Sequence, residues 1–448
     1  MRHNAAVVAP PVPVDHPLVK PVAVSGRGFY ITAFALLIVI GWAFFAWLTQ
    51  FLRGLGVTGM DRPVYWGVYI TNFVFFVGIS HAGTLISAIL RVTGSEWRRP
   101  ITRAAEAITV FALMVGPINV FFDLGRPDRV LNMFFHGQLH SPLMWDVICI
   151  GLYLVSSLLY LYLPLIPDIA ELRDAGVRPR WFYGWLSLGW RGTERQKHLL
   201  ERLIGIMAIA IIPIAVSVHT VVSWVFAMTV QPMWHSTIFG PYFVVGAIFT
   251  GIASILIAMA ILRKVYHLED YLKPIHFNNL GILLLVMACL WLYFTFAEYL
   301  TTFYGGEPAH MAVFYSKLKG EFAPMFWTMV VLCFILPFVI LAIRRFRTIS
   351  GTVVASISVN IGMWLERYTI VVPSLSNPRL PITDISYAPS WVEWSITAGC
   401  FAGLTLFYVL FSKIFPIISI WELKEGGLEV AAGTVITGAR VSERKEKR

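Results

Sequence analysis

Charged residues are scarce in this sequence. Only 13% of its 448 residues are Asp, Glu, Lys or Arg, and 57% are hydrophobic, whereas soluble domains average roughly 25% charged and 45–50% apolar residues. This composition excludes a water-soluble globular protein. Only helices or closed barrels satisfy the backbone in lipid, and the apolar runs here are far longer than the roughly ten residues of a barrel strand. The sequence therefore predicts an all-α integral membrane protein.

Cysteine is also scarce, and no span carries a haem pattern. The four cysteines are far apart and include no Cys-x-x-Cys pair, which argues against an iron–sulfur cluster held by this chain. Haem-binding helical bundles usually carry paired histidines on one helix near both membrane faces, and no span here does. We therefore expect no haem, no iron–sulfur cluster and no metal in this chain.

Long apolar runs are what the sequence does contain. Ten candidate spans lie at about 29–51, 65–92, 103–122, 142–164, 202–229, 238–264, 277–304, 324–345, 351–373 and 391–419. They predict a cytoplasmic N-terminal extension (1–28), a ten-helix transmembrane domain (29–420) and a basic cytoplasmic tail (421–448).

The basic residues predict the orientation. Of the 35 Lys and Arg residues, 27 fall on the side that holds both termini and the loops after spans 2, 4, 6 and 8. Short cytoplasmic loops are enriched in Lys and Arg, so we expect both termini in the cytoplasm, in a bacterial inner membrane. The net charge of +10 is then explained by topology and contact with lipid, and nucleic acid is not an expected partner.

Two sequence motifs recur in the same order. Gly67-Val-Tyr69 in span 2 matches Gly240-Pro-Tyr242 in span 6, and Pro142-Leu-Met-Trp145 matches Pro324-Met-Phe-Trp327 in span 8. They predict two four-helix bundles of parallel topology, spans 2–5 (65–229) and spans 6–9 (238–373), flanked by spans 1 and 10. The alternative is that these residue types are simply common in membrane helices.

Several ionisable residues fall inside the predicted spans. An ionisable group at such depth is unfavourable and points to function. His81 and His219 each suit either a ligand contact or an interhelical hydrogen bond. His219, Glu106, Glu298 and the Glu366-Arg367 pair could line a proton path, although Glu366 and Arg367 could equally form a neutral pair at the membrane interface.

The predicted outer loop between spans 3 and 4 is the densest polar cluster. It carries Asp123, Arg126 and His140, and Asp146 follows at the start of span 4. These groups would meet the headgroup of a membrane-dissolved ligand near water. The alternative is structural, since Gly125 and its neighbouring proline form a helix stop, and Asp123 and Arg126 could pair locally.

The order of these motifs resembles the polysulfide reductase membrane-subunit (NrfD-like) family. The similarity covers residues 30 to 420 and narrows toward the ActC-type quinol-binding subunit of alternative complex III. It rests on Trp66-Gly67-Val-Tyr69, Asp123-Leu-Gly125-Arg126-Pro127, Ser141-Pro142-Leu-Met-Trp145, His219-Thr-Val-Val-Ser223-Trp224 and Asn360-Ile-Gly362-Met-Trp364-Leu-Glu366-Arg367-Tyr368.

The resemblance implies a subunit without a redox centre of its own. Such a subunit binds menaquinol near the periplasmic face and passes electrons to a periplasmic iron–sulfur subunit, with haem c subunits and a second NrfD-like membrane subunit as further partners. Two alternatives remain. One is the quinone-reactive anchor of a polysulfide or dimethyl sulfoxide type reductase, and the other is a secondary transporter, which duplicated bundles also describe.

We therefore place a quinol site in the first bundle. Oxidising a quinol releases two protons, so the headgroup needs an acceptor within hydrogen-bond reach. The catalytic candidates are His81, Asp123, His140 and Asp146. Arg126 is expected to orient Asp123 by charge pairing, and Tyr69 and Trp145 to supply ring walls.

Overall fold

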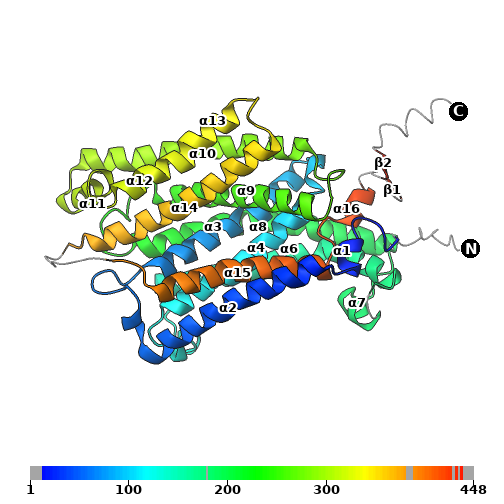
Figure 1. Ribbon diagram of the computed structural model, residues 1–448, viewed down its shortest axis with the longest axis horizontal. Coiled ribbons are helices and arrows are strands. Elements are labelled where there is room, and N and C mark those ends of the chain that lie inside the picture. Colours follow the sequence, from blue (N-terminus) through cyan, green and yellow to red (C-terminus); the bar gives the residue numbers. More distant parts are fainter. Residues whose placement is uncertain (1–12, 178–179, 380–386, 426–428, 432–433, 437–448) are drawn as a thin grey trace, which may run out of the picture.

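The computed structural model describes residues 13–177, 180–379, 387–425, 429–431 and 434–436. Almost all of the regular structure is helical, and the long helices run side by side along the long axis of the molecule (Figure 1). The predicted all-α membrane architecture is confirmed. The last residues of the predicted basic tail, 437–448, and the first twelve of the N-terminal extension lie outside the described residues.

Ten helical segments within the described residues are long and apolar enough to cross a membrane. They are α2 (Arg27–Arg53), α3 (Val68–Val92), α4 (Thr102–Asp123), α6 (Pro142–Asp174), α8 (Glu194–Ala227), α9 (Phe239–Val265), α10 (Pro274–Gly305), α12 to α13 (Ala323–Val330, then the π-helical turn η4 at Val331–Ile335, then Leu336–Ala342), α14 (Ile349–Ser376) and α15 (Trp391–Ile414).

Shorter elements join or flank these spans. They are α1 (Lys20–Ala23), α5 (Asn132–Phe135), α7 (Arg180–Leu186), α11 (Pro308–Leu318), α16 (Ile420–Glu425), the 3-10 turns η1 (Leu55–Val57), η2 (Glu96–Arg98) and η3 (Pro127–Arg129), and an antiparallel pair of short strands, β1 (Glu429–Ala431) and β2 (Thr434–Ile436). We call the end that carries α1, α7 and α16 the termini end, and the end that carries α11 the far end (Figure 1).

The helices contact one another in two rings. In the first, α3 packs on α4, α4 on α6, α6 on α8, and α8 back on α3. In the second, α9 packs on α10, α10 on α13, α12 and α13 on α14, and α14 back on α9. The helices α2 and α15 pair with each other beside the first ring. We call these rings bundle 1 and bundle 2.

Helix α3 joins the two bundles. It contacts α4 and α8 in bundle 1 and α9 and α14 in bundle 2. A Cβ atom on Gly251 of α9 would lie 2.3 Å from the Cβ of Ala82 on α3, so the absence of a side chain there lets the two backbones approach closely. Trp364 of α14 donates a hydrogen bond to the Asn72 side chain of α3 (2.8 Å). The bundles are therefore packed and hydrogen-bonded to each other.

Ion pairs close the termini end of bundle 1. Buried Arg103 of α4 pairs with buried Asp168 of α6, which also accepts hydrogen bonds from the first backbone amides of α16, Ile420 (3.0 Å) and Trp421 (2.8 Å). The neighbouring Glu422 is paired with Arg91 and with Arg98. Residues 421–425, predicted to begin the tail, thus form part of a helix packed on the transmembrane domain.

Some helix bounds differ from the predicted spans. Helix α6 continues to Asp174 through Pro164 and Pro167, and Arg103 donates to the Pro164 carbonyl (2.9 Å) in this stretch. Helix α15 ends at Ile414, five residues before the predicted end, because Phe415 precedes a proline and is extended (φ −130°, ψ 148°).

Candidate functional site

Hydrogen bonds tie three helices together at the far end of bundle 1. Tyr69, fully buried on α3, donates to Oε1 of Gln50 on α2 (2.6 Å). The Nε2 of Gln50 donates in turn to the carbonyl of Phe122 on α4 (2.6 Å). The next residue, Asp123, ends α4 and lies within electrostatic range of Tyr69.

Asp123 has an unpartnered carboxylate oxygen. The residue is partly exposed, but its Oδ1 is buried and has no hydrogen-bond partner among the described residues. Asp123 and Glu393 of α15 both lie within electrostatic range of Tyr69. A buried carboxylate without a partner is unfavourable, which makes Asp123 a candidate for binding or proton transfer.

Glu393 shows the opposite pattern. It is fully buried, and its carboxylate accepts hydrogen bonds from the Gly59 amide (2.7 Å), the Ser390 amide (2.8 Å) and the Tyr387 hydroxyl (2.6 Å). All of these partners lie in or beside the far-end loops. Glu393 therefore holds the loops in place, whereas Asp123 remains free to interact with a ligand.

Aromatic rings border the Asp123 site. The ring of Phe122 lies 6.4 Å from that of Tyr69 and 6.4 Å from that of Trp47 on α2, and Phe121 lies 6.1 Å from Trp47. Such rings offer flat apolar surfaces to a planar ligand. The site thus combines a free carboxylate, a buried hydroxyl and aromatic walls.

One predicted contact in the 3–4 loop differs from expectation. Arg126 does not pair with Asp123; its guanidinium makes two 3.0 Å bonds to Asp128, and both side chains are exposed. The predicted role of Arg126 in orienting Asp123 is therefore wrong. The indole of Trp145 donates to the carbonyl of Leu139 (2.5 Å), so it fastens the loop to the start of α6.

The other two far-end candidates have contrasting environments. His140 is exposed in the loop, while Asp146 on α6 is 8% exposed and its Oδ1 has no hydrogen-bond partner among the described residues. Asp146 is thus a second unsatisfied carboxylate of bundle 1, and the environment of His140 gives no sign of a specific role.

His81 lies deeper and faces another histidine. It is twelve residues beyond Tyr69 on α3, or about 18 Å along the helix axis. Its ring centroid lies 4.2 Å from that of His219 on α8, both residues are fully buried, and none of their four ring nitrogens has a hydrogen-bond partner within the described ranges. The structure therefore separates His81 from Asp123 and joins it to His219.

Bundle 2 contains a second group of buried ionisable residues. Arg367 and Glu366 of α14 are both buried, with Nη1 and Oε2 2.9 Å apart, so the pairing of these two residues is confirmed. Arg367 lies over the Phe243 ring (4.9 Å) and within electrostatic range of His219. The Glu366–Arg367 pair therefore connects the histidine pair to bundle 2.

The far end of bundle 2 adds a carboxylate and an amine. Glu298 on α10 accepts a hydrogen bond from Ser236 and, with buried Lys317 of α11, lines a cavity of about 20 Å³, enough for one water molecule. Lys317 lies within electrostatic range of both Glu298 and Glu366. Burial lowers the pKa of Lys317 to about 8, although the two carboxylates oppose this shift.

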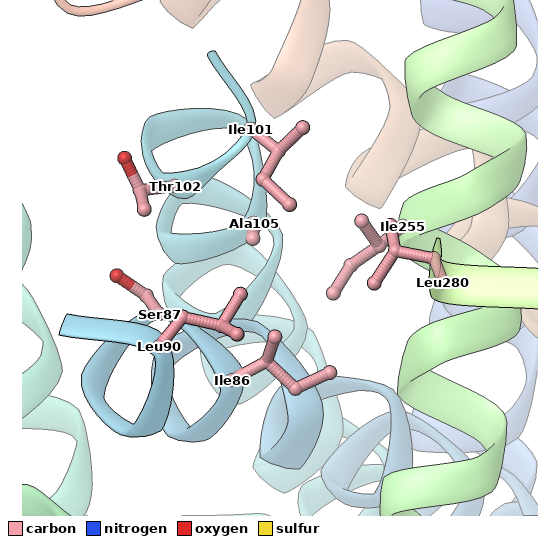
Figure 2. Close-up of a pocket in the computed structure, with 8 residues that line it drawn as sticks. All are labelled: Ile86, Ser87, Leu90, Ile101, Thr102, Ala105, Ile255 and Leu280. Atoms are coloured by element: carbon pink, nitrogen blue, oxygen red, sulfur yellow. The ribbon is translucent and has the colours of Figure 1, made fainter. Parts of the chain in front are cut away.

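Glu106 lies toward the termini end of bundle 1. It is buried on α4 and accepts a hydrogen bond from Ser87 of α3 (2.6 Å). Figure 2 shows an apolar gap lined by residues of α3, α9, α10 and the start of α4, with the Ser87 and Thr102 hydroxyls turned away from the apolar side chains. The polar groups of this region thus face the bundle 1 interior rather than the gap between the bundles.

Three residues of these groups were absent from the predicted site: Gln50, Glu393 and Lys317. Gln50 lies in a largely apolar span, so its polar side chain could have been recognised from the sequence as a candidate. Glu393 and Lys317 lie at or outside span ends, where charged residues are common and carry no signal.

A family model covers most of the chain. The model for polysulphide reductase, NrfD, matches residues 56–378. The chain belongs to the NrfD family. It is 23% identical over 412 residues to a selenate reductase subunit of Mesobacillus selenatarsenatis, a match that covers 88% of this chain and 95% of the relative.

Two other relatives match different shares of this chain. The Hdr-like menaquinol oxidoreductase integral membrane subunit of Archaeoglobus fulgidus is 21% identical over 418 residues, covering 88% of this chain and 95% of the relative. A candidate membrane subunit of a dimethyl sulfoxide reductase from Halobacterium salinarum is 30% identical over 242 residues. That match spans 54% of this chain and 53% of the Halobacterium protein, about half of each.

Proposed function

We propose that this NrfD-family chain is the quinol-binding membrane subunit of a quinol-oxidising electron-transfer complex. The observation that carries the proposal is Asp123, whose buried Oδ1 has no partner among the described residues and which follows Phe122 in the chain and lies within electrostatic range of Tyr69. The Archaeoglobus relative is named as a menaquinol oxidoreductase subunit, which favours menaquinol as the ligand.

In this proposal the chain supplies proton acceptance and orientation, and a partner supplies the electron acceptor. Menaquinol loses two electrons and two protons on becoming menaquinone, and the electrons pass to an iron–sulfur partner docked at the far end. Asp123 accepts the first proton from a quinol hydroxyl, and Tyr69 holds the headgroup against the Phe122 ring. Asp146 is the acceptor proposed for the second proton.

The buried groups beyond this site form the proposed proton path. The His81–His219 pair lies where α3 of bundle 1 meets α8 and bundle 2, and Arg367 is in electrostatic range of His219. Glu366 and Glu298 continue this series toward the far end of bundle 2, while Glu106 lies toward the termini end. Protons released from quinol could be exchanged along these groups, which would couple oxidation to translocation.

The type of complex that we propose is alternative complex III. It would place the far end in the periplasm, both termini in the cytoplasm of a bacterial inner membrane, and iron–sulfur, haem c and second NrfD-like subunits as partners. The basic-residue distribution and the two rings of helices support this arrangement, with the rings as the products of a duplication.

The names of two relatives favour a second candidate. Selenate reductase and dimethyl sulfoxide reductase subunits are among the similar proteins. The same site would then run toward reduction of an external substrate, with quinol still the electron donor. The partner polypeptides in a gently solubilised complex distinguish the two, since haem c chains are expected only in the first.

Substitution of Asp123 tests the proposed site. We expect Asp123→Asn to lower quinol turnover at least tenfold, equivalent to about 1.4 kcal/mol of barrier, because the amide cannot accept the proton. Asp128→Asn is the matched control, since Asp128 lies in the same region but is exposed and paired with Arg126. The measurement is steady-state quinol oxidation by purified complexes that contain the same polypeptides in the same amounts.

His81→Ala tests the deeper group in the same assay. We expect at least a tenfold loss there too, with assembly intact. Parental rates in both Asp123→Asn and His81→Ala would rule out the bundle 1 site and direct attention to Glu298 in bundle 2.

A further inference from the structure

Two exposed tryptophans stand on a short helix at the termini end. Trp181 and Trp185 are four residues apart on α7 and are 76% and 78% exposed. Residues at this spacing share one helix face. Leu188, 68% exposed, follows them in the next turn. Figure 1 shows α7 standing out from the bundles beside the termini-end tips of the long helices.

The opposite face of α7 is fixed to the transmembrane helices. Buried Tyr183 donates a hydrogen bond to the carbonyl of Ile414, the last residue of α15 (2.9 Å). Tyr162 of α6 donates to the Leu186 carbonyl (2.5 Å). Arg173 of α6 donates to the buried Ser187 hydroxyl (3.0 Å). The exposed tryptophan face is therefore held in a defined orientation.

These contacts also fix the depth of α7. Tyr162 lies twenty residues beyond the start of α6, or about 30 Å along it, which is the thickness of the hydrocarbon layer. Ile414 is the end of a membrane span. From these span lengths, we expect both anchors at the boundary between hydrocarbon and headgroups. Tryptophan is enriched at this depth because its ring is apolar and its N–H is polar.

Positive charge follows the tryptophans directly. Arg191 and Arg195 are exposed in the turn after α7 and in the first turn of α8, and within the described residues neither is paired with a carboxylate. Guanidinium groups bind phosphate through two parallel hydrogen bonds, so this charge is complementary to an anionic phospholipid headgroup.

We propose that α7 and the turn after it form a lipid-binding platform for the membrane leaflet at the termini end. Trp181 and Trp185 insert among the acyl-chain ends nearest the headgroups, and Arg191 and Arg195 bind the phosphate of an anionic phospholipid. The occupant is therefore lipid rather than a soluble partner protein. The proposal is independent of the quinol site at the far end.

Fluorescence quenching by brominated phospholipid tests the tryptophan part. The full chain is reconstituted into bilayers of phosphatidylcholine and phosphatidylglycerol, with bromine at the shallow end of the phosphatidylcholine acyl chains. The chain has 16 tryptophans. We expect Trp181→Phe/Trp185→Phe to remove roughly one eighth of the total tryptophan emission. The lost emission should belong to the fraction that the brominated lipid quenches. Trp234→Phe, at a buried position (1% exposed), should remove emission only from the unquenched fraction.

The outcomes separate lipid from the other occupants. If the emission lost in the double variant is unquenched by bromine but quenched by aqueous acrylamide, the platform faces water and the proposal is wrong. If it is protected from both quenchers only in the assembled complex, another polypeptide covers α7, and the proposal is also wrong.

A second measurement tests the charge part. Native mass spectrometry of the chain released from mixed bilayers should show retained phosphatidylglycerol, reduced at least threefold in Arg191→Gln/Arg195→Gln. Arg344→Gln/Arg345→Gln, which removes two exposed arginines from another termini-end loop, is the matched control. Equal retention in both double variants would rule out a specific phosphate site on the turn after α7.

Discussion

The two ends of the molecule treat buried charge in opposite ways. At the termini end, Asp168 and Glu422 are surrounded by arginine and backbone donors. At the far end, Asp123 and Asp146 each retain a buried carboxylate oxygen without a partner among the described residues. Asp168 and Glu422 therefore hold the structure together at the termini end, as Glu393 does for the far-end loops, whereas Asp123 and Asp146 remain available for chemistry.

The difference follows from what each end must do. A buried charge with a full set of partners resists removal of any one of them, which suits the closure of a bundle. A buried carboxylate without partners is unfavourable in the resting protein, and a ligand that supplies a hydrogen bond relieves that cost. Substitutions at the two ends therefore test this distinction.

The largest expected effect is on stability at the termini end. Asp168→Asn removes the charge that faces Arg103 and weakens the cap of α16, so we expect a loss of about 3–5 kcal/mol in the free energy of unfolding. Thermal or denaturant unfolding of the purified chain measures it. Asp174→Asn is the control, because its pair with Arg173 is half-exposed and worth less than about 1 kcal/mol. Equal losses in both variants would show that the buried Asp168–Arg103 pair stabilises the protein no more than the half-exposed Asp174–Arg173 pair.

Lys317 at the far end should produce a pH effect of similar size. Its pKa is lowered by burial from 10.5 to about 8, so between these pH values the unfolded chain binds this proton more tightly than the folded chain. The folded state is thus disfavoured below pH 8 and gains stability as the pH rises through this window. The stability of the parent relative to Lys317→Met should rise by on the order of 3 kcal/mol across it.

The same titration provides its own control. Lys319→Met is the matched control, because Lys319 lies two residues away but is exposed. If the difference in unfolding free energy between the parent and Lys317→Met does not change with pH, the Lys317 amine is not held in a poorly solvated environment.

The carboxylates of bundle 1 should show a smaller effect of the opposite sign. Asp146→Asn replaces an unsatisfied charge by a neutral amide, so we expect the free energy of unfolding to stay level or to rise by about 1 kcal/mol. Unfolding under the conditions used for Asp168→Asn measures the change. A loss as large as that of Asp168→Asn would show that Asp146 is a structural residue and would remove it from the proposed site.

The smallest effect concerns the hydrogen bond between the bundles. Trp364→Phe removes the donor to Asn72, and hydrogen bonds of this kind in membrane proteins average about 0.6 kcal/mol. Trp327→Phe is the control, since the Trp327 indole bonds only a nearby carbonyl, that of Leu318 (3.2 Å). A double-mutant cycle with Asn72→Ala isolates the pair, and zero coupling would show that packing alone holds the bundles together.

The sequence predicts the spans well, because the hydrocarbon thickness sets the length of each apolar run. It predicts the ends less well, since these depend on tertiary contacts. Helix α6 continues through two prolines to Asp174, in a stretch where Arg103, sixty residues earlier, donates to a backbone carbonyl. Periodicity and hydropathy carry no information about such a partner.

The same limit applies to the candidate site, where the sequence indicates which polar residues matter but not which of them meet. Tyr69 and Asp146 are both buried, and their selection from the sequence rested on the rule that an ionisable or polar group in an apolar run needs a reason to be there; their roles in the site stay predictions. Which groups meet is a different matter. The contact between His81 and His219 joins residues 138 positions apart, and the pairing of Arg126 with Asp128 rather than Asp123 depends on loop conformation. Neither follows from spacing along one helix.

The shared position of α3 has a consequence for biosynthesis. This helix carries Asn72, Ser80 and His81, and its bonding partner Trp364 lies almost 300 residues later in the chain. At translation rates of about 5–20 residues per second, α3 is made roughly 15–60 seconds before α14 leaves the ribosome. During that interval its polar side chains must stay inside the insertion machinery or be shielded by α4 and α8. The helix that is most deeply buried in the finished protein therefore waits for a partner made almost 300 residues later.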